Sequence, residues 1–122
     1  MSKLPRLRIG GRPDAGGAKA ILDRGHFEAN TMYDVALQRE ILEIFLIQVD
    51  EMRNRLISED VSVPDIKFLG HTLRGAAAAI GAAEFEALGK KLEKRGGDPH
   101  RFANLMLAAE QAFREAVRPY KV

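Results

Sequence analysis

The chain has 122 residues, 46% of them apolar and 30% charged, which suits one domain with a hydrophobic core and a polar surface. The absence of cysteine excludes a disulfide scaffold, thiol catalysis and cysteine-ligated zinc. Stretches without charge, such as 75–83, are far too short to cross a bilayer, and no apolar leader follows the basic N-terminal residues. We therefore expect a small cytoplasmic protein with no membrane contact.

The positive charge of the chain is concentrated at its N-terminus. Residues 1–22 hold five cations and one anion, a net charge of +4, whereas residues 23–122 hold fourteen cations and sixteen anions, a net charge of −2. Prolines, glycines and the lack of an apolar period predict a basic, disordered tail over 1–22 and one folded domain over 23–122. A basic arm could contact nucleic acid or acidic lipid, but the acidic domain argues against a nucleic-acid binder, and we expect a solvated tail.

Capping residues predict where the first two helices begin. Asp23 is expected to cap a short helix that runs through Phe27 and Met32, and Asp34 to cap a long helix. Apolar residues of the long helix recur at alternating steps of three and four, the spacing of a bundle helix. They are Leu42, Phe45, Val49, Met52 and Leu56.

Three further helices are expected after the long one. Pro64 is predicted at the start of the third helix and Gly81 at its end. The fourth helix continues to the glycines at 96–97, and Asp98 with Pro99 begins the fifth. No window shows the alternation of a strand, so we predict an all-α fold: an antiparallel four-helix bundle with an additional short N-terminal helix. The expected buried stripe of the fifth helix is Phe102, Leu105, Ala109, Ala112 and Ala116.

The helix that begins at Pro64 directs a histidine away from the core. At about 100° per residue, its apolar residues converge on one face and His71 lies nearly opposite. Lys67 stands one turn before His71 and Arg74 one turn after it. An exposed imidazole flanked by two cations is typical of a nucleophile that receives an anionic group.

Two glycines inside the same helix need an explanation, because each costs about 1 kcal/mol relative to alanine. Gly70 lies at the edge of the core face, where close helix packing explains it. Gly75 points away from the core and gains nothing from packing. A gap beside an exposed histidine indicates that something bulky approaches the ring.

These residues resemble a known signature. The segment from His71 to Ala82, HTLRGAAAAIGA, is similar to the motif of histidine-containing phosphotransfer (HPt) domains. The run DVALQREILEIFLIQVDEMRNRL before it resembles the long helix of bacterial single-domain members, and the likeness spans about residues 23–118. Arg74 stands where lysine is commoner, and Ala78 and Ala79 where Gly, Ser or Asn are frequent. Arg74 keeps the positive charge of the lysine, and Ala78 and Ala79 keep the small size of the residues usual at their positions.

The resemblance implies a phosphocarrier in a multistep phosphorelay. His71 would accept a phosphoryl group from the aspartate of one response-regulator receiver and pass it to another, with Lys67, Arg74 and Gly75 completing the transfer site. The chain would be a stoichiometric carrier without an ATP site or autokinase activity. We expect no cofactor and no metal in the chain, with Mg²⁺ on the receiver partner. Receivers and a hybrid histidine kinase are the expected partners of a monomer.

Phe68 and Ala78 are the expected docking residues. Phe68 lies far from the core direction, and aromatic side chains are enriched where binding energy concentrates. The alternative for Phe68 is a ring folded back over a neighbouring helix. The basic residues over 90–95 are expected to be a solvated helix end, with a rim that steers an acidic receiver as the alternative.

Other functions fit the same residues less well. One is a helical adaptor that docks a receiver or kinase without being phosphorylated. Another is the dimerisation domain of a histidine kinase, but its histidine is normally followed by an acidic residue, whereas Thr72 follows His71. His26 and His100 have no partner at metal-binding spacing and are expected to be surface or capping residues.

Overall fold

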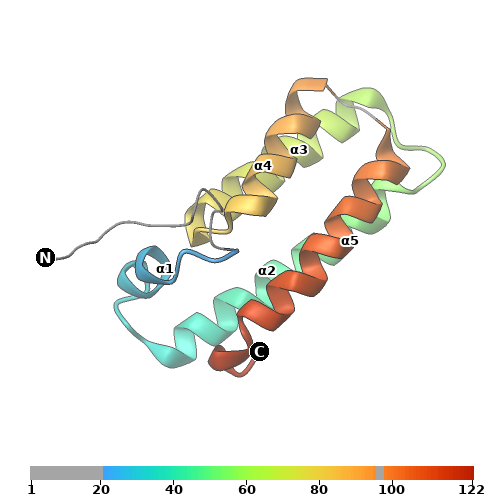
Figure 1. Cartoon of the computed structure of the whole chain (residues 1–122). Helices are drawn as coiled ribbons and strands as arrows, with labels where there is room; N and C mark the ends of the chain where they lie inside the picture. Colours follow the sequence, from blue (N-terminus) through green and yellow to red (C-terminus); the bar gives the residue numbers. More distant parts are fainter. Residues whose placement is uncertain (1–20, 96–97) are drawn as a thin grey trace, which may run out of the picture.

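The computed structural model describes residues 21–95 and 98–122. Four helices alternate in direction along the bundle, and a shorter one lies across one end of it (Figure 1). No strand occurs within the described ranges, so the predicted all-α bundle with an additional short N-terminal helix is confirmed. The elements are α1 (Arg24–Asn30), α2 (Val35–Leu56), α3 (Val63–Ile80), α4 (Ala83–Arg95), α5 (Pro99–Ala116) and the 3-10 helix η1 (Arg118–Tyr120).

Aspartates cap three of the helices as predicted. The carboxylates of Asp23, Asp34 and Asp98 accept hydrogen bonds from backbone N–H groups in the first turns of α1, α2 and α5. The predicted end of α1 was wrong, because the helix stops at Asn30. Met32, expected inside it, lies in the following turn with a left-handed φ of 52°.

Both ends of α3, the helix that carries the histidine, are fixed locally. Ser62 accepts from the backbone N–H of Asp65, and the Asp65 carboxylate accepts from that of Ser62, which forms a capping box. Pro64 lies in the first turn, where no N–H donor is needed. Gly81 ends the helix at a φ of 83°, a conformation that favours glycine.

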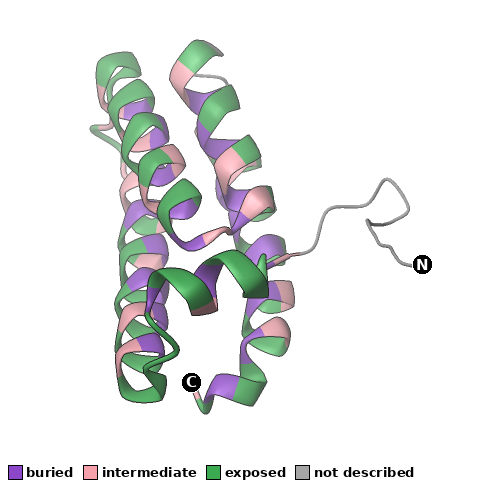
Figure 2. Cartoon of the chain, turned by 90° about the vertical axis from the view of Figure 1, so that its left-hand side faces the viewer, coloured by how far each residue is buried: buried purple, intermediate pink, exposed green. Residues whose placement is uncertain are grey.

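Three phenylalanines from three helices form the centre of the core. The ring centroids of Phe45 (α2), Phe85 (α4) and Phe113 (α5) lie 5.3–5.7 Å apart. Aromatic pairs at such distances stabilise by about 0.5–1.5 kcal/mol beyond their buried area. Figure 2 shows buried residues on the inward side of each long helix and exposed residues on the outward side.

The buried stripe predicted for α5 was wrong in part. Leu105 is 40% exposed and Phe102 only partly buried, whereas Met106 and Phe113 are fully buried. The apolar residues of α5 lie on several sides of the helix. Helical periodicity alone therefore permits more than one rotation of α5 relative to the core. The rotation observed places the bulky Met106 and Phe113 side chains in the core, where their apolar area is removed from water. The buried residues of α5 are Ala103, Met106, Ala109, Glu110 and Phe113.

The folded domain begins earlier than the predicted boundary at residue 23. Leu22, assigned to the tail, is 4% exposed, and Ile21 packs against the core. The expected disorder of residues 1–20 and the helix stop at 96–97 lie outside the described residues. In the part of the chain that the structure describes, no helix has the length and apolarity needed to span a membrane.

Candidate functional site

The helices α3 and α4 approach each other through two glycines. A Cβ at Gly70 would lie 2.6 Å from Leu92 Cβ and 2.8 Å from the carbonyl oxygen of Gly89, and would also clash with the backbone nitrogen of Glu93. A Cβ at Gly89 would lie 2.6 Å from the backbone nitrogen of Arg74. Real Cβ contacts are essentially never this short, so both positions require glycine. The close approach brings the outer edge of α4 beside His71.

Glu93 of α4 joins the two charged residues of α3. His71 Nδ1 lies 2.7 Å from Glu93 Oε2, and Arg74 Nε donates a hydrogen bond of 2.6 Å to Glu93 Oε1. The histidine side chain stays 60% exposed, while those of Arg74 and Glu93 are 35% and 32% exposed. One carboxylate thus holds an imidazole and a guanidinium at the same edge of the bundle.

The contact with Glu93 decides which nitrogen of His71 is nucleophilic. An ionised carboxylate only accepts hydrogen bonds, so Nδ1 must carry the proton at 2.7 Å from Glu93. The Arg74 guanidinium, 3.3 Å from Nδ1, is then a close neighbour and not a donor to that atom. In a neutral ring protonated at Nδ1, the lone pair lies on Nε2. The exposed side chain is therefore prepared to attack an electrophile through Nε2.

The charges at this edge stabilise one another. Hydrogen bonds from Arg74 first, and from His71 second, hold the pKa of the Glu93 carboxyl below its ordinary value. The same carboxylate raises the pKa of the Arg74 guanidinium. Glu93 is consequently ionised at neutral pH and keeps accepting from His71.

The other predicted site residues of α3 lie around His71 on the outward side. Lys67 and Ala78 are exposed, and Phe68 is 67% exposed, so its ring is not folded into the core. No atom lies within 4 Å of the place where a Cβ on Gly75 would stand. The structure thus brings a cation, an aromatic ring and open space together beside the imidazole.

Arg74 differs from its expected setting, and Glu93 was absent from the sequence-based site. Arg74 was expected on the outward face, but it is half buried and paired with Glu93. Helical periodicity describes one helix at a time, so it could not indicate a carboxylate 22 residues away from His71. Gly89, a glycine inside the fourth predicted helix, is a sequence signal that could have indicated a close helix contact near Glu93.

The remaining histidines do not form a second site. His26 and His100 are exposed in the first turns of α1 and α5, where their backbone N–H groups donate to the capping aspartates. Among the described residues no group of three potential metal ligands occurs. The exposed Lys90, Lys91 and Lys94 fit the expected solvated end of α4.

The fold and the site together define an antiparallel helical bundle that holds an exposed histidine between charged neighbours. The model of the Hpt domain family matches residues 40–117, and the chain belongs to that family. Membership makes it a phosphotransfer domain of two-component systems, a phosphocarrier that interacts with receiver or kinase partners. Neither the curated proteins nor the solved structures contain a significant match.

Proposed function

We propose that Nε2 of His71 accepts a phosphoryl group from the aspartyl phosphate of a response-regulator receiver and passes it to a second receiver. The observation that carries this proposal is the 2.7 Å contact between His71 Nδ1 and Glu93. It keeps the proton on Nδ1 and leaves the lone pair on Nε2 of an exposed ring.

The chain supplies the nucleophile for the transfer. The Nε2 lone pair forms the N–P bond while the bond from phosphorus to the aspartate oxygen breaks, and the carboxylate leaves with its electron pair. The imidazole that results carries positive charge, which the Glu93 carboxylate beside Nδ1 stabilises. The reverse sequence passes the group to the second receiver. In this proposal the receiver supplies Mg²⁺, and the chain itself holds no cofactor or metal.

Charge and shape around His71 favour a phosphoryl group carried by a partner. Lys67 stands one helical turn before the histidine, and no ion pair joins it to another described residue. Its ammonium is therefore available to the phosphoryl oxygens. Gly75 and Ala78 leave room for the receiver, and the exposed Phe68 offers it an apolar contact. One copy of the chain carries the whole site, so we propose that the protein is a monomer. We also propose that it works in the cytoplasm.

Acid-labile labelling from a phosphorylated receiver tests the proposal. His71→Gln should take up no phosphate and should melt like the wild type, because the side chain points outward. His26→Gln and His100→Gln are the matched controls and should label normally. Undiminished labelling of His71→Gln would exclude this acceptor. A wild type that binds receivers but is labelled by none of them would favour the adaptor instead.

A further inference from the structure

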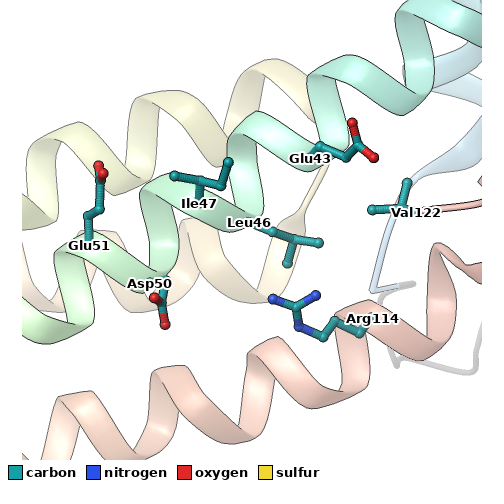
Figure 3. Close-up of a pocket in the computed structure, with 7 residues that line it drawn as sticks. All are labelled: Glu43, Leu46, Ile47, Asp50, Glu51, Arg114 and Val122. Atoms are coloured by element: carbon teal, nitrogen blue, oxygen red, sulfur yellow. The ribbon is translucent and has the colours of Figure 1, made fainter.

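A groove lies between α2 and α5, on helices other than those that form the histidine site. Its volume is about 630 Å³. In Figure 3, Leu46 and the guanidinium of Arg114 face each other across the gap, and Glu43 and Val122 stand at one end. The lining residues are Glu43, Leu46, Ile47, Asp50, Glu51, Arg114 and Val122.

The lining combines apolar surface with an excess of negative charge. Three carboxylates and one guanidinium give it a net charge of −2. Asp50 pairs with Arg53, and Arg114 pairs with Glu110. Glu43 and Glu51, the other two carboxylates of the lining, form no ion pair with a described residue. Ile47 is 58% exposed and the neighbouring Ile44 49% exposed. A matching occupant would be cationic and would also carry large apolar side chains.

The chain contains one segment of this kind. Residues 3–9 read KLPRLRI, in which basic and apolar residues alternate after the proline. In an extended segment, alternate side chains point to opposite sides, so Leu7 and Ile9 can face an apolar surface. The long side chains of Arg6 and Arg8 can then extend to carboxylates at the edges of that surface. The segment belongs to the part of the chain that carries +4, attached to a domain that carries −2.

The start of the described chain lies close to one end of the groove. Arg24 Nε donates to Tyr120 Oη at 3.1 Å, and the rings of Phe27 and Tyr120 are 5.5 Å apart. Val122, at the end of the groove, follows Tyr120 by two residues. Residues 10–20 can span up to about 36 Å when extended, at about 3.3 Å per residue. Residues 3–9 can therefore reach the groove from Ile21.

We propose that residues 3–9 of this chain bind the groove of the same molecule. Leu7 and Ile9 pack on the apolar lining, and Arg6 and Arg8 pair with Glu43 and Glu51. Tethering gives the segment an effective concentration in the millimolar range, which favours it over a free partner with a similar sequence. His71 lies on α3 against α4, so the acceptor stays accessible while the groove is filled.

Paramagnetic broadening in the full chain tests this proposal. The chain has no cysteine, so Ser2→Cys gives a single site for a nitroxide label. Amides of 43–51 and 114–122 should lose at least about twofold more intensity than those of 67–78, since tethered docking keeps the segment bound most of the time. Raising the salt from about 0.1 M to about 1 M shortens the Debye length from about 10 Å to about 3 Å and should weaken the effect.

Charge reversal identifies the contacts. In the labelled chain, Arg6→Glu with Arg8→Glu should abolish the selective broadening, and so should Glu43→Lys with Glu51→Lys. The matched control, Arg12→Glu with Lys19→Glu, makes the same change in charge outside the segment and should keep it.

Three results would overturn the proposal. Two of them are broadening spread evenly over the bundle and broadening confined to α3 and α4. The third is broadening transferred from a labelled copy to an unlabelled copy, which would make the occupant a second molecule. None of these results depends on phosphoryl transfer at His71.

Discussion

Two glycines on α3 stand five residues apart and have opposite surroundings. Gly70 is buried against the backbone of α4, where even a methyl group would clash. Gly75 faces open space, and a methyl group in its place would have no atom within 4 Å. Both lower the intrinsic helix propensity by about the same amount, about 1 kcal/mol. The glycine at position 70 is therefore required by helix packing, whereas packing does not explain the glycine at position 75.

The two faces of α3 depend on each other. The contact between Gly70 and Gly89 sets the separation of α3 and α4, and Glu93 lies one turn beyond Gly89. At that separation the Glu93 carboxylate reaches both His71 and Arg74. A buried backbone contact thereby sets the geometry of the exposed histidine.

The largest effect is expected on the open face. Gly75→Leu should slow transfer from a phosphorylated receiver by about a hundredfold, because displacing the reacting groups by about 1 Å costs that much. Stability should be unchanged or higher, since leucine is the better helix former. Transfer rates and urea unfolding, measured on the same sample, check both expectations. A variant that unfolds more easily would show that this glycine serves packing after all.

The packed face should respond in the opposite way. Gly70→Ala should lower the free energy of unfolding by about 1–3 kcal/mol, because the added methyl overpacks the contact with α4. Gly75→Ala is the matched control and should raise the free energy of unfolding by about 0.5–1 kcal/mol. Urea denaturation of both variants gives the comparison. Equal responses would mean that α3 and α4 separate easily.

Phe68 tests whether the exposed face is an interface. Phe68→Ala should weaken receiver binding by about 1–3 kcal/mol, as expected for an aromatic residue at a docking surface. It should change the melting temperature little, because the ring is 67% exposed. Calorimetric titration with a receiver, alongside thermal melts, measures the two quantities. Normal binding by this variant would place the docking surface elsewhere on the bundle.

The smallest effect is expected from the charge of Glu93. The folded-state pKa of the Glu93 carboxyl is lowered by Arg74 first and by His71 second. Ionised Glu93 therefore stabilises the fold at pH values above the ordinary carboxyl pKa of 4.5. That stabilisation is lost as the pH falls through the lowered pKa. Thermal melts of the wild type and Glu93→Gln should differ at pH 6 to 7 and converge at strongly acidic pH. A difference in melting temperature that does not depend on pH would show that the ionised Glu93 carboxylate is not what stabilises the fold.

Interpretation of the sequence succeeded where the signal was local. The caps at Asp23, Asp34 and Asp98 each depend on one side chain and the next few backbone N–H groups. It failed for α5, where apolar residues on several sides permit more than one rotation and Leu105 was assigned to the core. Leu22 was missed because one apolar residue at the end of a polar, glycine-rich segment has no period to indicate burial.

The sequence by itself determined the helices and the direction of His71. Helical period and capping depend on residues within about one turn of each other, so His71 and Gly75 could be placed on an outward face before any packing was known. Only the tertiary structure decided what His71 touches. Glu93 comes from another helix, and its distance from His71 follows from how closely α3 and α4 pack at Gly70 and Gly89. That separation is a property of two surfaces in contact, which no single helix contains.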